Sequence, residues 1–350
     1  TLTRIQLYQI GISYYYKGLH GFAINHLNKI VFEVEDSLSQ YAFYYLGDSY
    51  RESQNRIEAM NAFRSASLLD SDSLVQHDAF YQFSILCYEQ QNPLYDAIQY
   101  LSEFIDKYPK SKHVDEVYRC LANTHLYTNN YSEAINVLEA SGLLNKEVQK
   151  QYQKISFQKG IQLYNDALYD DAIRYFGKSI SVGGNDSILC QSYYWQGESH
   201  YNLKAYGAAL NSYSKIYKKN NQLYSKSLYS QAYCHLNLND YANSINKFQS
   251  SLEYYTENKF LYDIFMRIGD NYFVLMDYQL AIHYYDKALL LAGFEDDYAS
   301  YKKSTSYVLL QDYNNAITSF NKLINSFNNS NYVDDAIYDL GNTYILAKEL

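Results

Sequence analysis

The sequence predicts an all-α protein made of tandem helix pairs, and three observations lead to that prediction. A short motif recurs along the chain at intervals of 35 to 38 residues, and self-similarity at such a period is typical of repeat architectures. Within each copy, apolar residues follow the i, i+3, i+4, i+7 spacing of an amphipathic helix. Only 2 Pro and 14 Gly occur among 350 residues, so a structure built on tight β-hairpins is not expected.

Each copy contains two small residues and three aromatic or apolar ones at fixed spacing. In Gly197-x-x-His200, Tyr206-x-x-Ala209 and Tyr213, the second small residue follows the first by 12 positions. We number every repeat so that this second small residue is position 20, which makes the first one position 8 and the last ring position 24. Position 20 is Ala23, Ala59, Ala97, Ala134, Ala172, Ala209, Ser244, Ala281 and Ala316, and a tenth copy begins at Gly341.

Each copy is interpreted as two helices joined by a short polar turn such as Asn239-Asp240. A small residue lets two helices approach closely and accommodates a large ring of the partner helix. Two short helices cannot bury both faces alone, so stacking of neighbouring repeats must supply the stability. We therefore expect about nine full repeats and a partial tenth in one continuous array over residues 1–350, with a weak junction near residues 140–153.

The motif Gly/Ala-x-x-Tyr, then Tyr-x-x-Ala-Ile and a following aromatic, resembles the tetratricopeptide repeat. The resemblance covers essentially the whole chain, although the period exceeds the family's usual 34 residues. It implies a right-handed superhelical solenoid of antiparallel helix pairs in which the first helix of each pair lines a concave face. It also implies a non-enzymatic scaffold that binds peptide or protein segments along that face.

A second, local resemblance suggests a different setting. Tyr108-Pro109-Lys110-Ser111 before Val114–Tyr118 is echoed by 327–330 before 333–337. Such a segment, in which Pro stops one helix and Ser caps the next, is similar to bacterial periplasmic repeat proteins of the outer-membrane-assembly lipoprotein and Tol–Pal coordinator type. This resemblance implies the alternative role of spacer or assembly component in a bacterial envelope or secretion machine. It favours a periplasmic or envelope location and leaves a cytoplasmic one open.

Composition excludes several other classes. The net charge of −9 argues against a nucleic-acid partner, which would require a basic surface. The longest apolar runs are too short to span a bilayer, so no transmembrane segment is expected. The four Cys form no C-x-x-C pair and no catalytic or phosphate-binding motif occurs, so we expect no enzyme, metal or cofactor. The chain begins at Thr1, and we expect it to be a fragment of a longer protein.

In the resembled family, positions 2, 5, 9, 12 and 13 of each repeat face the ligand. Tyr suits such a surface because it offers a large contact area, few rotors and one hydroxyl. The alternative is that many of the 44 Tyr pack between repeats. The residues expected on the binding face are Tyr44, Asp48, Arg51, Arg119, Asn123, Tyr127, Tyr164, Tyr194, Glu198, Tyr201, Asn202, Tyr229, Tyr233, Asn237, Asp270 and Tyr301.

The charges at these positions indicate the kind of partner. They lean acidic, so we expect a protein or peptide segment with apolar and some basic residues. Some family members bind a C-terminal carboxylate with a clamp of Lys, Arg and Asn. Arg119, Asn123 and Lys154 match it partly, but Gln191 and Trp195 stand where further basic residues would be needed, so the clamp is not expected.

The final helix provides a further expectation. Ile337, Leu340 and Tyr344 are spaced to form an apolar stripe on it. No second helix of the same repeat follows in the sequence to cover this stripe. We therefore expect the helix to contact either more of the native chain or another molecule.

Overall fold

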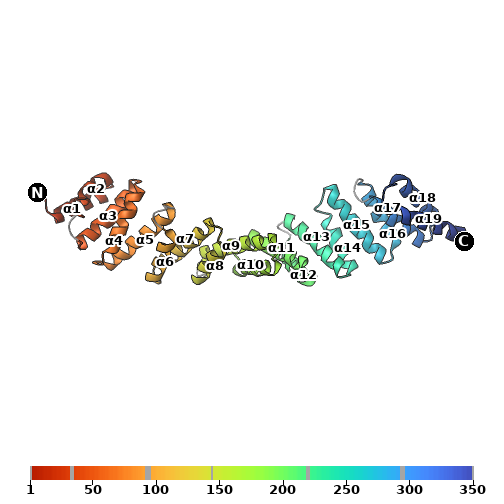
Figure 1. The fold of residues 1–350 in the computed structure, drawn as a ribbon, viewed down its shortest axis with the longest axis horizontal. Helices are drawn as coiled ribbons and strands as arrows, with labels where there is room; N and C mark the ends of the chain where they lie inside the picture. Colours follow the sequence, from red (N-terminus) through yellow and green to blue (C-terminus); the bar gives the residue numbers. More distant parts are fainter. Residues whose placement is uncertain are drawn as a thin grey trace. The chain divides into compact units, whose positions relative to one another are not determined.

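A computed structural model describes residues 2–31, 35–90, 96–142, 145–217, 221–291 and 296–348. These residues form 19 α-helices, and none of them lies in a β-strand. Two compact units result: unit 1 is Thr1–Lys159 and unit 2 is Gly160–Leu350. The predicted all-α fold of helix pairs is confirmed, and within each unit consecutive helices pack side by side in antiparallel fashion (Figure 1).

Unit 1 holds four helix pairs, and the second helices of the first three pairs also pack on the first helix of the next pair (Figure 1). Its helices are α1 (Arg4–Tyr16), α2 (His20–Leu27), α3 (Ser37–Glu52), α4 (Arg56–Leu68), α5 (Ser73–Gln90), α6 (Ala97–Lys107), α7 (Val114–Tyr127), α8 (Tyr131–Ala140) and the first part of α9 (Lys146–Asn165).

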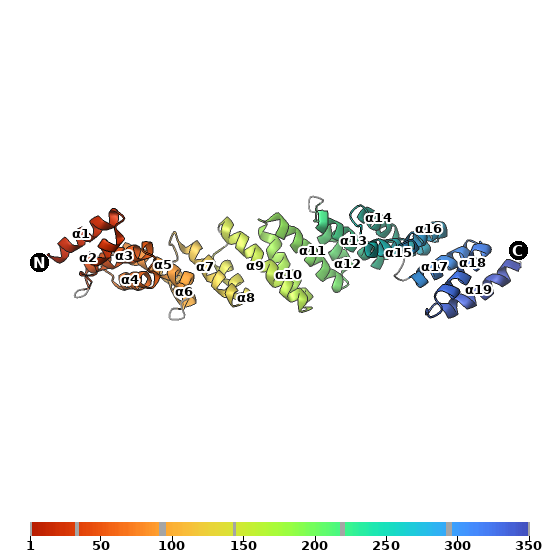
Figure 2. The same cartoon turned by 90° about the horizontal axis from the view of Figure 1, so that it is seen from above.

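Unit 2 repeats the same pattern in its described residues, and Figure 2 shows it from a second direction. Its helices are the end of α9, α10 (Tyr169–Val182), α11 (Asp186–Asn202), α12 (Tyr206–Ser214), α13 (Asn221–Asn237), α14 (Tyr241–Ser251), α15 (Asn258–Val274), α16 (Tyr278–Leu289), α17 (Asp296–Leu309), α18 (Tyr313–Ser326) and α19 (Val333–Lys348). The boundary between the units lies within α9, and a single array over residues 1–350 stays a prediction.

The small residues of the motif are buried, as predicted. Of the nine position-20 residues, all but the partly buried Ala97 have no exposed surface. Four position-8 glycines contact the ring at position 24 of the same repeat so closely that no side chain fits between them, and these are Gly47, Gly160, Gly197 and Gly269. A Cβ atom on Gly197 would lie 2.5 Å from Tyr213, and one on Gly269 would lie 2.7 Å from Tyr285. The spacing of 16 residues in the motif therefore reflects a direct contact across the helix pair.

The turns inside the repeats have a recurrent conformation wherever the structure describes them. One residue adopts a positive φ, and the next residue begins the second helix as its N-cap. In repeats seven to nine this cap is an Asp, such as Asp240, whose carboxylate accepts the backbone N–H three residues on. The positive-φ residues of the described turns are Gly18, Gln54, Asn129, Ala167, Lys204, Asn239, Met276 and Gln311. The predicted polar turn at Asn239-Asp240 is confirmed.

The Pro-containing segment and its echo form equivalent connections between repeats. α6 ends at Lys107 and α7 begins at Val114, and α18 and α19 flank the echo. The Ser111 hydroxyl accepts the N–H of His113 at 3.1 Å, and Ser330 accepts that of Tyr332 at 3.0 Å. The sequence predicted that Ser111 caps α7, and this prediction is wrong because the N-cap residue is His113. The serine instead stabilises the turn that precedes the helix.

Two further features of the described residues bear on the sequence expectations. Cys87, Cys120, Cys190 and Cys234 are free and buried, and burial raises the pKa of the Cys87, Cys120 and Cys234 thiols to about 12. These thiols therefore stay protonated and act as small apolar side chains. None of the described helices combines the length and the apolar character needed to cross a membrane.

Candidate functional site

Three repeats have an acidic residue at position 9, and these residues are Asp48, Glu198 and Asp270. Asp48 is buried, and the other two are partly buried. The hydroxyl of Tyr213 donates to Oε1 of Glu198 at 2.7 Å, and that of Tyr285 donates to Oδ1 of Asp270 at 3.0 Å. In both repeats the donor is the position-24 ring that covers the preceding glycine. A buried phenol requires an acceptor, so these carboxylates have a structural role as well as any role in binding.

The residue at position 9 depends on the ring at position 24. Repeat five has Phe176 at position 24, which has no hydroxyl, and Ile161 at position 9. Repeat two has Phe63, and there Asp48 is satisfied differently, by the Tyr15 hydroxyl at 3.1 Å and the Arg51 guanidinium at 2.7 Å. The acid thus occurs where the local structure supplies donors for it.

Burial sets the ionisation of these groups. It raises the pKa of the Asp48 and Asp270 carboxyls above the ordinary value, and nearby Arg residues oppose that change. Burial and the neighbouring carboxylates also raise the pKa of the Tyr213 and Tyr285 phenols. The phenols are therefore neutral hydrogen-bond donors at physiological pH.

The tyrosines at position 5 connect one repeat to the next. Tyr229 donates to Oδ2 of Asp263 at 2.6 Å, and Tyr301 donates to Oδ2 of Asp339 at 2.9 Å. Tyr44 makes the corresponding bond in unit 1, to Asp78. These hydroxyls therefore stabilise the stacking of repeats, which is the alternative role considered for them from the sequence.

Positions 12 and 13 form a second link between repeats. The Asn202 side-chain amide donates to the Tyr164 hydroxyl at 3.2 Å, and Asn237 donates in the same way to Tyr201 at 3.3 Å. Both Asn residues are exposed. In unit 1, Tyr127 has 65% of its surface exposed and is thus the most accessible of the predicted tyrosines.

Two cavities in unit 2 lie along the predicted face. The larger has a volume of about 630 Å³, the smaller one of about 280 Å³, and both are lined by Glu198, Tyr229 and Ser230. The smaller cavity is completed by Tyr201 and Tyr233. The larger is completed by Tyr194, Gln222, Ser225, Lys226, Tyr254, Tyr255, Thr256, Glu257 and Phe260. Five of the predicted binding residues, Tyr194, Glu198, Tyr201, Tyr229 and Tyr233, therefore come together here.

Tyr254, Tyr255 and Phe260 were not among the residues predicted from the sequence. Tyr254 and Tyr255 lie in the connection between α14 and α15, and Phe260 lies in the first turn of α15, so none is at an inward position of a repeat. Tyr255 and Phe260 have ring centroids 5.0 Å apart, and Tyr229 lies 5.8 Å from Tyr255. The signal that could have found them is a pair of adjacent tyrosines before a first helix, with a third ring at the start of that helix.

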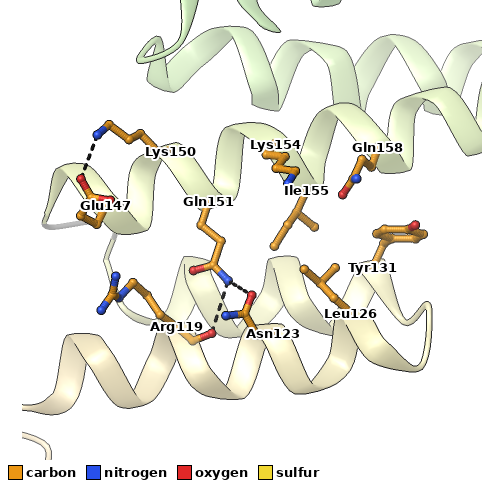
Figure 3. Close-up of a pocket in the computed structure, with 10 residues that line it drawn as sticks. All are labelled: Arg119, Asn123, Leu126, Tyr131, Glu147, Lys150, Gln151, Lys154, Ile155 and Gln158. Carbon is orange, nitrogen blue, oxygen red and sulfur yellow. Dashed lines mark hydrogen bonds and ion pairs between the residues drawn. The ribbon is translucent and has the colours of Figure 1, made fainter. Parts of the chain in front are cut away.

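A cavity of about 450 Å³ in unit 1 has a different character. Figure 3 shows Gln151 of α9 pointing toward α7, where its amide donates to Oδ1 of Asn123 at 2.6 Å and to the Arg119 carbonyl at 3.3 Å. The other lining residues are Leu126, Tyr131, Glu147, Lys150, Lys154, Ile155 and Gln158. The structure therefore brings the predicted Arg119 and Asn123 together with Lys154, as the partial clamp match suggested. Lys150, Gln151 and Gln158 were missed because they lie outside the inward positions.

The comparisons with known proteins agree with this architecture. A family model described as "Tetratricopeptide repeat" matches residues 78–111 and 298–330. One matched segment lies in unit 1 and the other in unit 2, and both support a relationship to the tetratricopeptide repeat family. No curated protein matches the sequence of this chain.

Several solved structures are similar to this chain at low sequence identity. MamA, residues 41 to the end, from Desulfovibrio magneticus RS-1, is 18% identical, covering 51% of this chain and 94% of that one at a TM-score of 0.36. The P58(IPK) TPR domain is 14% identical, and the match covers 99% of this chain and 98% of that one at a TM-score of 0.31. YrrB, described as a TPR protein with an unusual peptide-binding site, is 16% identical, with 55% and 91% covered and a TM-score of 0.39.

Helix α19 corresponds by its motif to the first helix of a further helix pair. Its position-8 glycine, Gly341, has no atom within 4 Å of where a Cβ would lie, unlike the glycines covered by a ring. Ile337 and Tyr344 have 52% and 45% of their surface exposed, whereas Leu340 is partly buried. An exposed apolar stripe on this helix was predicted, and Ile337 and Tyr344 provide it. Contact of this stripe with another molecule stays a prediction.

Proposed function

We propose that this chain is a protein-interaction scaffold that docks segments of other proteins on the first helices of its repeats. Proteins of the tetratricopeptide repeat family are generally non-catalytic scaffolds. The observation that carries the proposal is the grouping of Tyr194, Glu198, Tyr201, Tyr229 and Tyr233 around two cavities that share lining residues. These residues belong to α11 and α13, the first helices of two successive repeats.

The chemistry of this surface suits an extended polypeptide. Tyrosine rings provide apolar contact area, and their hydroxyls remain neutral donors. The exposed amides of Asn202 and Asn237 can donate to and accept from a peptide backbone. The carboxylates favour a partner with some basic residues. A spacer role in a bacterial envelope or secretion machine is the alternative, and the Tyr108–Ser111 segment is the feature that suggests it.

Selection from a library of random linear 15-residue peptides tests the proposal. We expect the chain to enrich a family of related sequences, and Tyr201→Ala to weaken their binding at least tenfold without changing the melting temperature by more than a few degrees. Tyr175→Ala is the matched control, because Tyr175 is partly buried like Tyr201, belongs to the second helix α10 and lines neither cavity. A failure to enrich any sequence, or equal binding by both variants, would contradict docking at this face.

A further inference from the structure

The position-9 carboxylates differ in how their charge is balanced. Asp48 forms an ion pair with Arg51 at 2.7 Å, and Asp270 forms one with Arg267 at 3.0 Å. Glu198 accepts hydroxyl hydrogen bonds from Tyr213 at 2.7 Å and from Ser230 at 2.9 Å. Within the described part of the chain, no Lys, Arg or His lies within ion-pair distance of Glu198. Its carboxylate therefore has hydroxyl donors but no cationic partner.

Beside Asp270, basic side chains come from position 6 of its own repeat and from position 6 of the next repeat. Position 6 is Arg267 in repeat eight and Lys302 in repeat nine. The Lys302 ammonium lies 4.6 Å from the centroid of the Phe273 ring and 5.8 Å from that of Tyr298. Aromatic rings with a nearby carboxylate thus already hold a basic side chain within this array, as cation–π attraction and ion pairing predict.

Repeat seven has Ser230 at position 6, and a cavity is found where the longer basic side chain would extend. This smaller cavity is lined by Glu198, Ser230 and three tyrosines. The larger cavity shares Glu198 and Ser230 and adds the rings of Tyr255 and Phe260. Because the Ser230 side chain is short, it leaves the cavity unfilled and leaves the Glu198 carboxylate without a cationic partner.

The larger cavity extends this arrangement outward. It is lined by a second carboxylate, that of the exposed Glu257, and by the exposed Lys226. The ionisable groups of the lining are thus two carboxylates and one ammonium, and no ion pair joins Lys226 to either acid in the residues described. The lining is therefore net negative as well as rich in tyrosine.

We propose that this pair of cavities receives the side chain of a lysine or arginine from the docked protein segment. The inference rests on the function proposed above and names the residue that the unit 2 surface selects. The aliphatic stem of the basic residue lies against the rings of Tyr229 and Tyr255, and its charged group pairs with Glu198. The partner thus supplies the cation that Arg267 and Lys302 supply in the following repeats.

Peptides enriched from the random library provide the first test. In each one, every Lys is replaced in turn by norleucine and every Arg by citrulline, which keeps the aliphatic stem of the side chain and removes its charge. We expect one such replacement to weaken binding to the wild-type chain at least tenfold, and to weaken binding to Glu198→Gln less than twofold. Glu253→Gln is the matched control, because Glu253 is exposed and lines neither cavity.

The outcomes separate this inference from the function on which it rests. If enriched peptides bind equally well after every neutral replacement, or if Glu198→Gln and Glu253→Gln respond alike, the cationic pocket is wrong while docking stands. If no peptide is enriched, the docking function itself fails. Thermal unfolding of both variants by circular dichroism establishes that they are folded.

A second variant tests the cavity without any ligand. Ser230→Lys places a lysine where repeat nine has Lys302, and we expect it to raise the melting temperature by several degrees over Ser230→Met, which has similar length and no charge. The same change should abolish binding of the enriched peptides because it fills their site. Equal melting temperatures for the two variants, with peptide binding unaffected, would overturn the proposal.

Discussion

Contacts between residues 15 and 16 positions apart determine how each repeat packs. The glycine at position 8 admits the ring at position 24, and the acid at position 9 accepts the hydroxyl when that ring is Tyr. The first contact was predictable, because small and large residues at fixed spacing in antiparallel helices must meet. The second was not, because periodicity alone does not show that a Tyr hydroxyl is buried and needs an acceptor.

The glycine contact leads to a prediction about stability. Gly197→Ala would place a methyl group 2.5 Å from the Tyr213 ring, and we expect this overpacking to lower the free energy of unfolding by about 1–3 kcal/mol. Gly177→Ala is the matched control in the same unit, because its Cβ would lie 3.8 Å from the nearest atom, on Gln196. The control should gain about 0.5–1 kcal/mol from helix propensity.

Urea unfolding of the two alanine variants measures both effects. The sign of the change is the informative result, since the substitution is chemically identical at the two sites. A Gly197→Ala protein as stable as Gly177→Ala would show that the ring does not occupy the position described.

A single ion pair predicts a dependence of stability on pH. The Arg4 guanidinium donates to Asp36 at 2.9 Å, and this hydrogen bond lowers the pKa of the Asp36 carboxyl to about 2 from its ordinary 3.8. Because the folded pKa is the lower one, the pair stabilises the fold above about pH 4 and loses this contribution as the pH falls toward 2. Since Asp36 is 39% exposed, we expect only about 1 kcal/mol after solvent screening.

Urea unfolding of wild type and Asp36→Asn at pH 5.5 and at pH 2.5 measures what the Arg4–Asp36 pair contributes to the free energy of unfolding. The difference in unfolding free energy should be present at the higher pH and largely lost at the lower one. A difference that is constant across this range would mean that Asp36 acts only as an N-cap hydrogen-bond acceptor for α3.

At the level of helices and turns, the sequence was most informative about where the second helix of each pair begins. The small residue at position 20 identified all nine second helices, from Ala23 in α2 to Ala316 in α18. The junction near α9 was harder, because the motif fades there. The residues that complete the cavities, among them Gln151 in α9 and Phe260 in α15, lie outside the positions of the repeating motif. Their positions depend on how successive repeats pack, which no single repeat encodes.

The turns within repeats store strain that one substitution can remove. Met276 adopts φ 62° and is 74% exposed, a conformation that costs a residue with a side chain about 1–2 kcal/mol. Met276→Gly should therefore raise the free energy of unfolding by about 0.5–1 kcal/mol after allowing for the greater freedom of glycine in the unfolded chain.

Asn239→Gly is the matched control, because Asn239 lies in the equivalent turn at φ 59° and Asn tolerates this region well. Its gain should be less than half that of Met276→Gly in the same chemical denaturation assay. A loss of stability at Met276 would show that its side chain makes a contact worth more than the backbone strain.

At the scale of the whole molecule, the tyrosines have two roles. Many of their hydroxyls join adjacent repeats, as Tyr229 does with Asp263, while their rings line the cavities of unit 2. Both roles follow from an amphipathic side chain that fits between stacked repeats. The sequence predicted a binding face with an acidic tendency, but it could not show that Glu198 lacks the cation present beside Asp48 and Asp270.

Docking on the first helices is tested most directly by hydrogen exchange of the intact chain with and without a peptide enriched from the library. We expect the peptide to slow amide exchange in α11 and α13, around Tyr194–Asn202 and Tyr229–Asn237. Helices α12 and α14 should change little. Protection confined to α12 and α14, or unchanged exchange in all four helices at saturating peptide, would contradict the proposed binding face.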